Sequence, residues 1–249
     1  MAAEPTPNAT PNEPLPTLKI HTATTTHLAS TAALHGQQLP NGLFPALGAP
    51  FLRTWHTTFL DSAHAAAAVM VDTSADDTVA GYLLLATDPL DHVHELKVKH
   101  RRELLRTGML GLARRPRIGL YFARTRATRY TKRLLTRRPH HQDHQTETPP
   151  AVVHAVVTSP RYVRQGVARR LLEWAEEHAA EAGAAQLALV TDTETAPASP
   201  DAVLAPDELQ GAAAMYDHLG WRRVAVRERD GRTLMEYRKD LPTGVTPND

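Results

Sequence analysis

A short loop, Arg164-Gln165-Gly166-Val167-Ala168, lies between an apolar run and a stretch with helical periodicity. The first backbone N–H groups of a helix have no partner within the helix, and the helix dipole adds positive potential there. The small residues Gly166 and Ala168 would let a phosphate approach the main chain closely. The loop therefore predicts a site that binds an anion mainly through backbone groups.

Two common kinds of nucleotide site are excluded at this loop. The Gly-Lys-Ser/Thr sequence of a P-loop is absent, and so is the Gly-x-Gly-x-x-Gly spacing of a dinucleotide site.

The loop resembles the signature of the GNAT superfamily of acyl-CoA-dependent N-acyltransferases. In that family a proline follows the fourth strand, and Gln/Arg-x-x-Gly-x-Gly/Ala then lies over the CoA pyrophosphate. Here Pro160 precedes the loop, Gly166 and Ala168 match, and Val163 replaces the expected Gln or Arg.

A second motif of the same family occurs downstream. Ala212–Trp221 is similar to Ala-x-x-x-Tyr-x-x-x-Gly-Phe, with tryptophan in place of phenylalanine. The resemblance is strong over Ala151–Asp240, weak over Thr17–Asp88 and absent between them.

The resemblance implies acetyl-CoA as co-substrate and direct attack by an amine in a ternary complex. It assigns CoA contacts to Val157, Thr158, Val163, Arg164, Gln165, Gly166, Val167, Ala168 and Arg169. Main-chain N–H groups near Val157 and Thr158 would hold the oxyanion, and Tyr216 would be the acid that protonates the departing thiolate. Residues such as Tyr216 can also be packing residues, and that alternative stays open.

An amine needs a base, because an alkylammonium group has a pKa of about 10.4. His154 is the only polar side chain between Ala151 and Val157, and its ordinary pKa near 6.5 suits a base. Some family members carry a glutamate base at the position of Val152, which shares strand parity with His154. Asp192 and Glu194 are alternatives, and a structural role for His154 also remains open.

The elements that must position these residues can be read from hydrophobic periodicity and turn residues. Strands are predicted at Thr17–Thr22, Ala65–Val71, Val79–Thr87, Ala151–Thr158, Gln186–Thr191, Arg222–Glu228 and Thr233–Lys239. Helices are predicted over Thr26–Gln37, from Pro50, over Leu96–Pro116, over Tyr121–Leu135, from Gly166 to Gly183, and from Asp207 to Gly220. The loop Leu39–Gly48 is a weaker candidate for contact with the acceptor.

The predicted fold class is α/β: a mixed, mostly antiparallel central sheet with helices on both faces, GNAT-like, with a basic helical insertion between strands three and four. Residues 17–240 would form one N-acyltransferase domain, with the insertion and a linker at 91–150. Residues 1–16 are predicted to be a disordered tail, and 241–249 a second tail.

Composition narrows the class of protein. The 249 residues include no cysteine, which excludes disulfides, zinc-thiolate sites and cysteine nucleophiles. His140, His141 and His144 lack a ligand pattern, so no metal is expected. The longest uncharged apolar run, Ala65–Val71, is far too short for a membrane helix, and the first residues do not form a signal peptide. A cytoplasmic protein without membrane contact is expected.

Charge is strongly asymmetric along the chain. The segment Glu95–Arg138 carries a net +13, so the rest carries −12 of the total of +1. The segment could be a lid over the acceptor site that meets the acidic loop Asp192–Glu208, or a grip for an acidic macromolecule. Three functions remain: acetylation of a small primary amine, which is favoured; acetylation of a macromolecule, with nucleic acid possible but not favoured; and a non-catalytic CoA-binding sensor. The sequence leaves the acceptor, the acyl chain length and the oligomeric state open.

Overall fold

A seven-stranded sheet forms the centre of the molecule, in a computed structural model that describes residues 16–115, 149–193, 211–229 and 232–242. The strand order is β1-β2-β3-β4-β5-β7-β6. The strands are β1 (Leu18–Thr22), β2 (Ala65–Asp72), β3 (Thr78–Ala86), β4 (Ala151–Thr158), β5 (Gln186–Thr193), β6 (Arg222–Arg229) and β7 (Arg232–Asp240). Neighbouring strands are antiparallel except β4 and β5, which are parallel.

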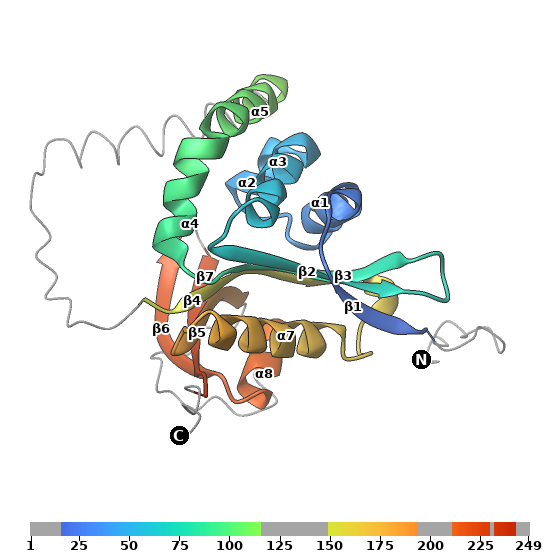
Figure 1. Cartoon of the computed structure of the whole chain (residues 1–249), viewed down its shortest axis with the longest axis vertical. Coiled ribbons are helices and arrows are strands. Elements are labelled where there is room, and N and C mark those ends of the chain that lie inside the picture. Colours follow the sequence, from blue (N-terminus) through green and yellow to red (C-terminus); the bar gives the residue numbers. More distant parts are fainter. Residues whose placement is uncertain (1–15, 116–148, 194–210, 230–231, 243–249) are drawn as a thin grey trace, which may run out of the picture.

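Helices cover both faces of this sheet (Figure 1). One face carries α1 (Leu28–Gln38), preceded by the 3₁₀ turn η1 (Thr25–His27), together with α2 (Leu43–Leu47) and α3 (Ala49–Leu60). The other face carries α7 (Val167–Glu181), which follows the 3₁₀ turn η3 (Pro160–Tyr162), and α8 (Gly211–His218). The predicted fold class, a mixed and mostly antiparallel α/β sheet with helices on both faces, is confirmed. The loop predicted at Leu39–Gly48 contains the short helix α2.

The helix α7 follows its sequence pattern closely. Its buried residues, Val167, Leu171, Leu172, Ala175 and Ala179, recur at helical spacing and face the sheet. Gly183 lies just beyond the end of the helix with φ of 84°. The N–H of Ala184 donates to the carbonyl of Ala179 at 2.9 Å, and the N–H of Gly183 donates to that of Ala180 at 2.9 Å. These two bonds form the Schellman motif that the glycine predicts.

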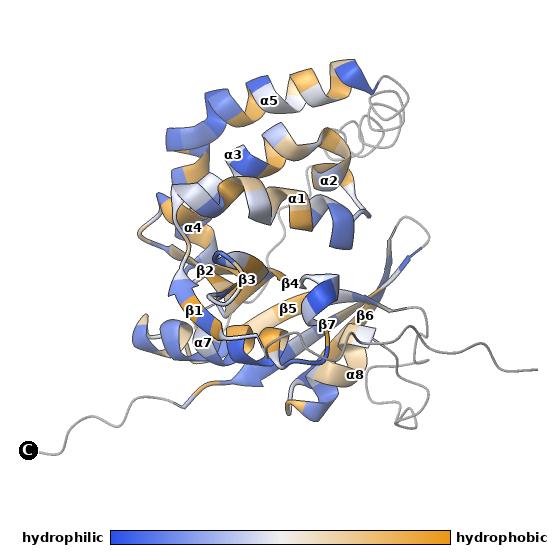
Figure 2. Cartoon of the chain, turned by 90° about the vertical axis from the view of Figure 1, so that its right-hand side faces the viewer, coloured by the Kyte–Doolittle hydropathy of each residue, from blue (hydrophilic) through white to orange (hydrophobic). Residues whose placement is uncertain are grey.

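Between β3 and β4 the chain forms α4 (Pro89–Glu95), the π-helical turn η2 (Leu96–His100) and α5 (Arg101–Arg114). The helix α5 packs against α2 and α3, and it approaches so closely that a Cβ atom on Gly111 would lie 2.4 Å from the carbonyl oxygen of Leu47. Leu104 and Leu112 face this contact, whereas Leu105 and Met109 are exposed. Figure 2 shows apolar and polar residues alternating along α5.

Several sequence predictions concern residues outside the described ranges: the two tails over most of their length, the helix Tyr121–Leu135, and the histidines at 140, 141 and 144. No helix in the described part of the chain is long and apolar enough to cross a membrane.

Candidate active site

The strand β4 loses its parallel neighbour halfway along its length. Its register with β5 covers only Ala151, Val152 and Val153, opposite Leu187, Ala188 and Leu189. From His154 onward the edge of β4 that faces β5 has no strand partner among the described residues. An unpaired edge exposes backbone donors and acceptors, which a ligand can use.

Only every second amide of β4 faces this open edge. The N–H of Ser159 donates to the carbonyl of Ala80 on β3 at 2.8 Å, so the odd-numbered residue Val157 also directs its N–H toward β3. The N–H groups of Val156 and Thr158 therefore point to the open edge. Of the two amides predicted for the oxyanion, the geometry favours that of Thr158.

The predicted anion-binding loop continues directly from β4 through η3. Gly166 caps α7 in the left-handed conformation, with φ of 76° and ψ of 8°, and Arg164 is also left-handed with φ of 65°. A Cβ atom at Gly166 would meet nothing within 4 Å. Within the described residues, the N–H groups of Val167, Ala168 and Arg169 have no hydrogen-bond partner. Unpartnered amides at the start of a 15-residue helix fit a phosphate.

Two long-range contacts hold this loop in place. The buried Tyr162 donates its hydroxyl proton to Oδ2 of Asp72 at 3.0 Å. Asp72 lies at the end of β2, where hydrogen bonds from Ser74, opposed by burial and assisted by Tyr162 and Thr17, lower the pKa of its carboxyl. Gly81 of β3 lets α7 approach the sheet, because a Cβ atom there would lie 2.5 Å from Cγ1 of Val167. The sequence did not predict either contact, because each joins residues about 80 to 90 positions apart.

Tyr216 is buried in the aliphatic core beneath the sheet, on the same face as α7. Its ring packs against Trp221 at a centroid distance of 5.9 Å and against Tyr237 at 5.3 Å. Burial, with a smaller contribution from Tyr237, raises the pKa of Tyr216 well above its usual value. A tyrosine hydroxyl is protonated at neutral pH even at its ordinary pKa near 10, and the raised pKa makes Tyr216 a weaker acid.

His154 lies on the opposite face. Ala155 pairs with Leu84 and Val153 with Leu85, so His154 is the extra residue of a β-bulge. The bulge changes the alternation of β4: Val153 faces the core of α7, whereas His154 and Ala155 both face the helices of the other side. His154 is exposed on that side, whereas Val153 and Ala155 next to it are buried.

Aromatic rings surround the imidazole of His154. The centroid distances are 5.2 Å to Phe59, 6.3 Å to Trp55 and 6.2 Å to His92. Partial desolvation by these neighbours, followed by repulsion from His92, lowers the pKa of His154, although its side chain is still in contact with solvent. The imidazole is therefore neutral at pH 7 and can accept a proton, although it is a weak base.

Asp192 and Glu194 are the two alternative candidates for the base. Asp192 forms an ion pair with Arg232 of β7, which occupies its carboxylate. Glu194 lies outside the described residues.

A buried polar network that the sequence reading did not identify lies on the same face as His154. Nδ1 of His35 lies 2.5 Å from the hydroxyl oxygen of Tyr82 and 3.4 Å from Nε2 of His56. Nδ1 of His56 in turn lies 3.0 Å from Oγ1 of Thr31. Burial lowers the pKa of His35 to about 4, and burial together with His35 lowers that of His56 to about 3. Both imidazoles are neutral at pH 7.

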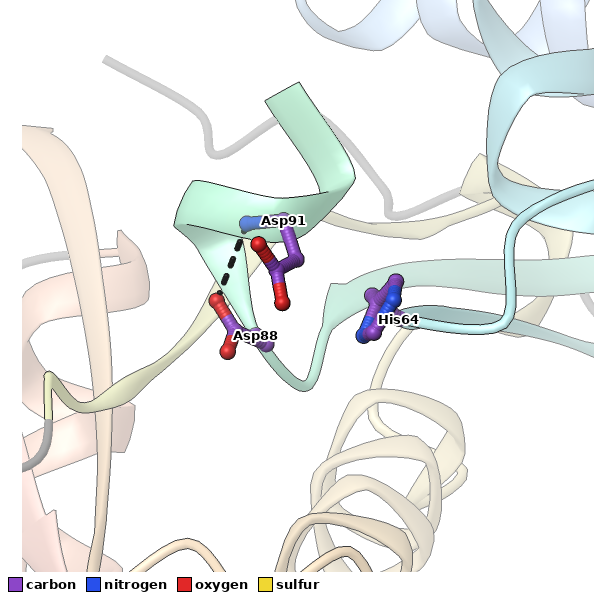
Figure 3. A group of neighbouring side chains, drawn as sticks. All are labelled: His64, Asp88 and Asp91. Carbon is purple, nitrogen blue, oxygen red and sulfur yellow. Dashed lines mark hydrogen bonds between the residues drawn. The ribbon is translucent and has the colours of Figure 1, made fainter. Parts of the chain in front are cut away.

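One group in the described residues has the spacing of cation ligands. The ligand atoms of His64, Asp88 and Asp91 lie within 4.8 Å of one another at the start of α4 (Figure 3). Oδ1 of Asp88 already accepts from the N–H groups of Leu90 and Asp91 at 3.0 and 3.1 Å, as a helix N-cap does. Carboxylates are favourable at a helix start without any metal, so we assign none here.

Comparison with known proteins supports the family predicted from the two motifs. Residues 134–200 match the model of the acetyltransferase (GNAT) family. No curated protein matches the sequence significantly.

Solved structures share the fold at low sequence identity. The ribosomal-protein-S18-alanine N-acetyltransferase from Escherichia coli is 14% identical, with a TM-score of 0.50, and the alignment covers 94% of this chain and 98% of that chain. A GCN5-related N-acetyltransferase from Kribbella flavida is 11% identical, with a TM-score of 0.52 and coverage of 90% and 98%. An N-acetyltransferase from Staphylococcus aureus Mu50 is 11% identical, with a TM-score of 0.50 and coverage of 91% and 99%. The predicted resemblance to the GNAT superfamily is confirmed.

Proposed function

We propose that this chain, with its GNAT match and fold, is an N-acetyltransferase that uses acetyl-CoA to acetylate the primary amine of a small molecule. The cytoplasm, which contains acetyl-CoA, is the proposed location. The proposal goes beyond the family match in naming the acyl group, the acceptor class and the residues involved.

This proposal rests on the continuity between the open edge of β4 and the anion-binding loop. The open edge of β4 from His154 to Thr158 leads directly into the loop where Val167, Ala168 and Arg169 present unpartnered amides. An extended ligand with an anionic end could bind its phosphates at the loop and place its other end along the strand. The pantetheine and pyrophosphate of CoA have this shape and charge. Contacts from Val163, Arg164 and Gln165, which are exposed beside Gly166, complete the proposed cofactor set.

The chemistry divides between the two faces of the sheet. Bound acetyl-CoA would supply the activated acetyl group as a thioester. On the α3 side, neutral His154 would accept the proton of the attacking amine. At the open edge, the N–H of Thr158 would stabilise negative charge on the carbonyl oxygen. On the α7 side, Tyr216, whose hydroxyl is protonated at neutral pH, would protonate the leaving thiolate.

A protein acceptor is the second candidate, and one observation favours it. Val98, Leu105 and Met109 are 69%, 53% and 63% exposed on η2 and α5. Basic residues accompany them: Lys97, Lys99, Arg101, Arg102 and Arg106. An apolar stripe with basic flanks fits an acidic polypeptide better than a small amine. The proposed lid over the acceptor site competes with this role for the same segment.

The test measures CoA release from acetyl-CoA with a panel of primary amines, and the mass of each product. We expect an increase of 42 Da on one class of amine. Acidic peptides with free N-termini form the parallel arm. Release of CoA only with peptides would favour the protein acceptor. Binding of CoA without transfer of acetyl to any amine or peptide would favour the CoA-binding sensor.

A further inference from the structure

Three buried polar atoms on α4 have no hydrogen-bond partner within the described residues: Nδ1 and Nε2 of His92 and Oε2 of Glu95. Native proteins rarely leave such atoms unpaired, because burial removes water without a replacement. His92 is only 2% exposed, so the cost applies to the whole imidazole. Each such atom in a native protein needs an explanation, and a catalytic role or a bound water or ion is one.

The two His92 atoms belong to a ring that lies beside the candidate base. The ring of His92 packs on Phe59 at a centroid distance of 4.5 Å and lies 6.2 Å from the ring of His154. His92 and Glu95 are three residues apart on α4, so their side chains share one face of the helix. A small rotation of the rings, or one ordered water, would connect the two imidazoles.

Contacts within the same segment orient Glu95. Its Oε1 accepts from Nζ of Lys99 at 2.7 Å, while Oε2 remains without a partner. The neighbouring groups of Lys99 and then Ser62 lower the pKa of Glu95 to about 2, so the carboxylate is ionised. Burial lowers the pKa of His92, Glu95 opposes that change, and His100 and His64 add to it. The negative charge of Glu95 therefore acts on the His92 ring and favours its protonated form.

Hydrogen bonds at its start also hold α4 in place. Asp88 caps its first turn, and the carbonyl oxygen of His64 accepts from the N–H groups of Thr87 and Asp88 at 3.0 and 3.2 Å. Figure 3 shows His64 beside the start of this helix. The backbone that carries His92 is thus anchored to the start of β2 and the end of β3.

We propose that Glu95, His92 and His154 form a relay in which His92 and Glu95 are positioning residues for the base. His154 takes the proton from the ammonium group of the acceptor on one ring nitrogen. Its other nitrogen donates its N–H to the lone pair of His92, and the N–H of His92 donates to Oε2 of Glu95. The positive charge that His154 gains faces the carboxylate through His92, and the proton leaves to water because His154 is exposed. This inference rests on the proposed function.

The relay predicts a characteristic pattern of kinetics. His92→Phe keeps an aromatic ring against Phe59 and should lower kcat about 10- to 100-fold, as loss of an orienting partner does. Glu95→Gln should cause a smaller loss of kcat. The KM for acetyl-CoA should not change in either variant. Adding His92→Phe to His154→Gln should cost nothing further, because residues that act as one unit are not additive. His94→Asn, an exposed change on the same helix, is the matched control.

A measurement without an acceptor separates this inference from the proposed function. In histidine-labelled protein, ¹⁵N shifts should show one tautomer of His154 in the wild type and in His94→Asn, and a mixture in His92→Phe. Equal tautomers in all three proteins, or losses of kcat that multiply in the double variant, would overturn the relay. If the wild type binds CoA but acetylates no amine of the panel, the proposed function fails, and the tautomer result still decides whether His92 positions His154.

Discussion

The two faces of the sheet are built from different kinds of groups. Beneath the sheet, the buried residues of α7 are aliphatic and α8 adds Tyr216, and the groups that could bind an anion are backbone amides at Val167, Ala168 and Arg169. Above it, four imidazoles lie among aromatic rings of α1, α3, α4, β3 and β4. They belong to His35, His56, His92 and His154.

This difference indicates a division of labour. A site made of backbone amides depends on main-chain geometry and tolerates many side chains, provided that glycine occurs where φ is positive. A site made of imidazoles depends on side-chain identity and on pH. We therefore expect binding of the co-substrate to fail with backbone changes beneath the sheet, and proton transfer to fail with side-chain changes above it.

The largest effect is expected for Gly166→Glu. The new side chain would place a negative charge where the phosphates bind, so the thermal stabilisation by CoA should disappear. For the wild type at a CoA concentration of 100 Kd, that stabilisation is about 2.7 kcal/mol. The matched control is Gly183→Glu at the other end of α7, where φ is also positive and the added Cβ also meets nothing within 4 Å. Equal CoA shifts in both variants would exclude the proposed anion site.

Tyr216→Phe should lower kcat by about 10²- to 10⁴-fold, the usual contribution of a positioned acid, while CoA still binds. The ring packing remains and only the hydroxyl is lost. Tyr237→Phe is the control beside it, since that hydroxyl donates to the carbonyl of Ala213 at 3.3 Å and has no proposed chemical role. Steady-state kinetics of the two variants measure the difference. Similar kinetics would make Tyr216 a packing residue.

Two glycine substitutions compare the faces directly. Gly81→Ala would force α7 away from β3, and Gly111→Ala would force α5 away from α2. Each should destabilise the fold by about 1–3 kcal/mol, as overpacking does. Only Gly81→Ala should also weaken CoA binding, because only α7 carries the amides. Denaturant titration measures the loss of stability, and CoA thermal shifts measure the loss of binding. Weaker CoA binding in Gly111→Ala would contradict the division of roles between the two faces of the sheet.

The smallest effect concerns pH. The pKa values of His35 and His56 are about 4 and 3 in the folded protein, below the ordinary value of about 6.5, so the unfolded chain binds more protons in this range. Their contribution to stability is complete above pH 6.5 and is lost as pH falls toward 4 and then 3. Each histidine can contribute a slope of up to about 1.4 kcal/mol per pH unit. Denaturant titrations at pH 7, 6 and 5 should show that the free energy of unfolding depends less steeply on pH in His56→Leu than in the wild type. An unchanged slope would argue against His35 and His56 as a neutral buried pair.

Much of this arrangement was predictable. The strand Ala151–Thr158 was predicted with its observed bounds, because β-branched residues and the following Ser159-Pro160 are local signals. Both ends of α7 were predicted from glycines that adopt positive φ, and the strands β6 and β7 were predicted to within one residue of their observed bounds. The two motifs of the GNAT family were likewise contiguous in sequence.

The sequence by itself thus determined the order of elements, the anion-binding loop and the resemblance to the GNAT family, since each depends on residues close together in the chain. The tertiary structure alone decided which face His154 occupies, because a single bulged residue in β4 reverses the alternation. It also decided which amide of β4 reaches the open edge, and it brought His92 of α4 beside His154. These features arise from register and packing between segments about 60 to 90 residues apart, and no local pattern encodes them.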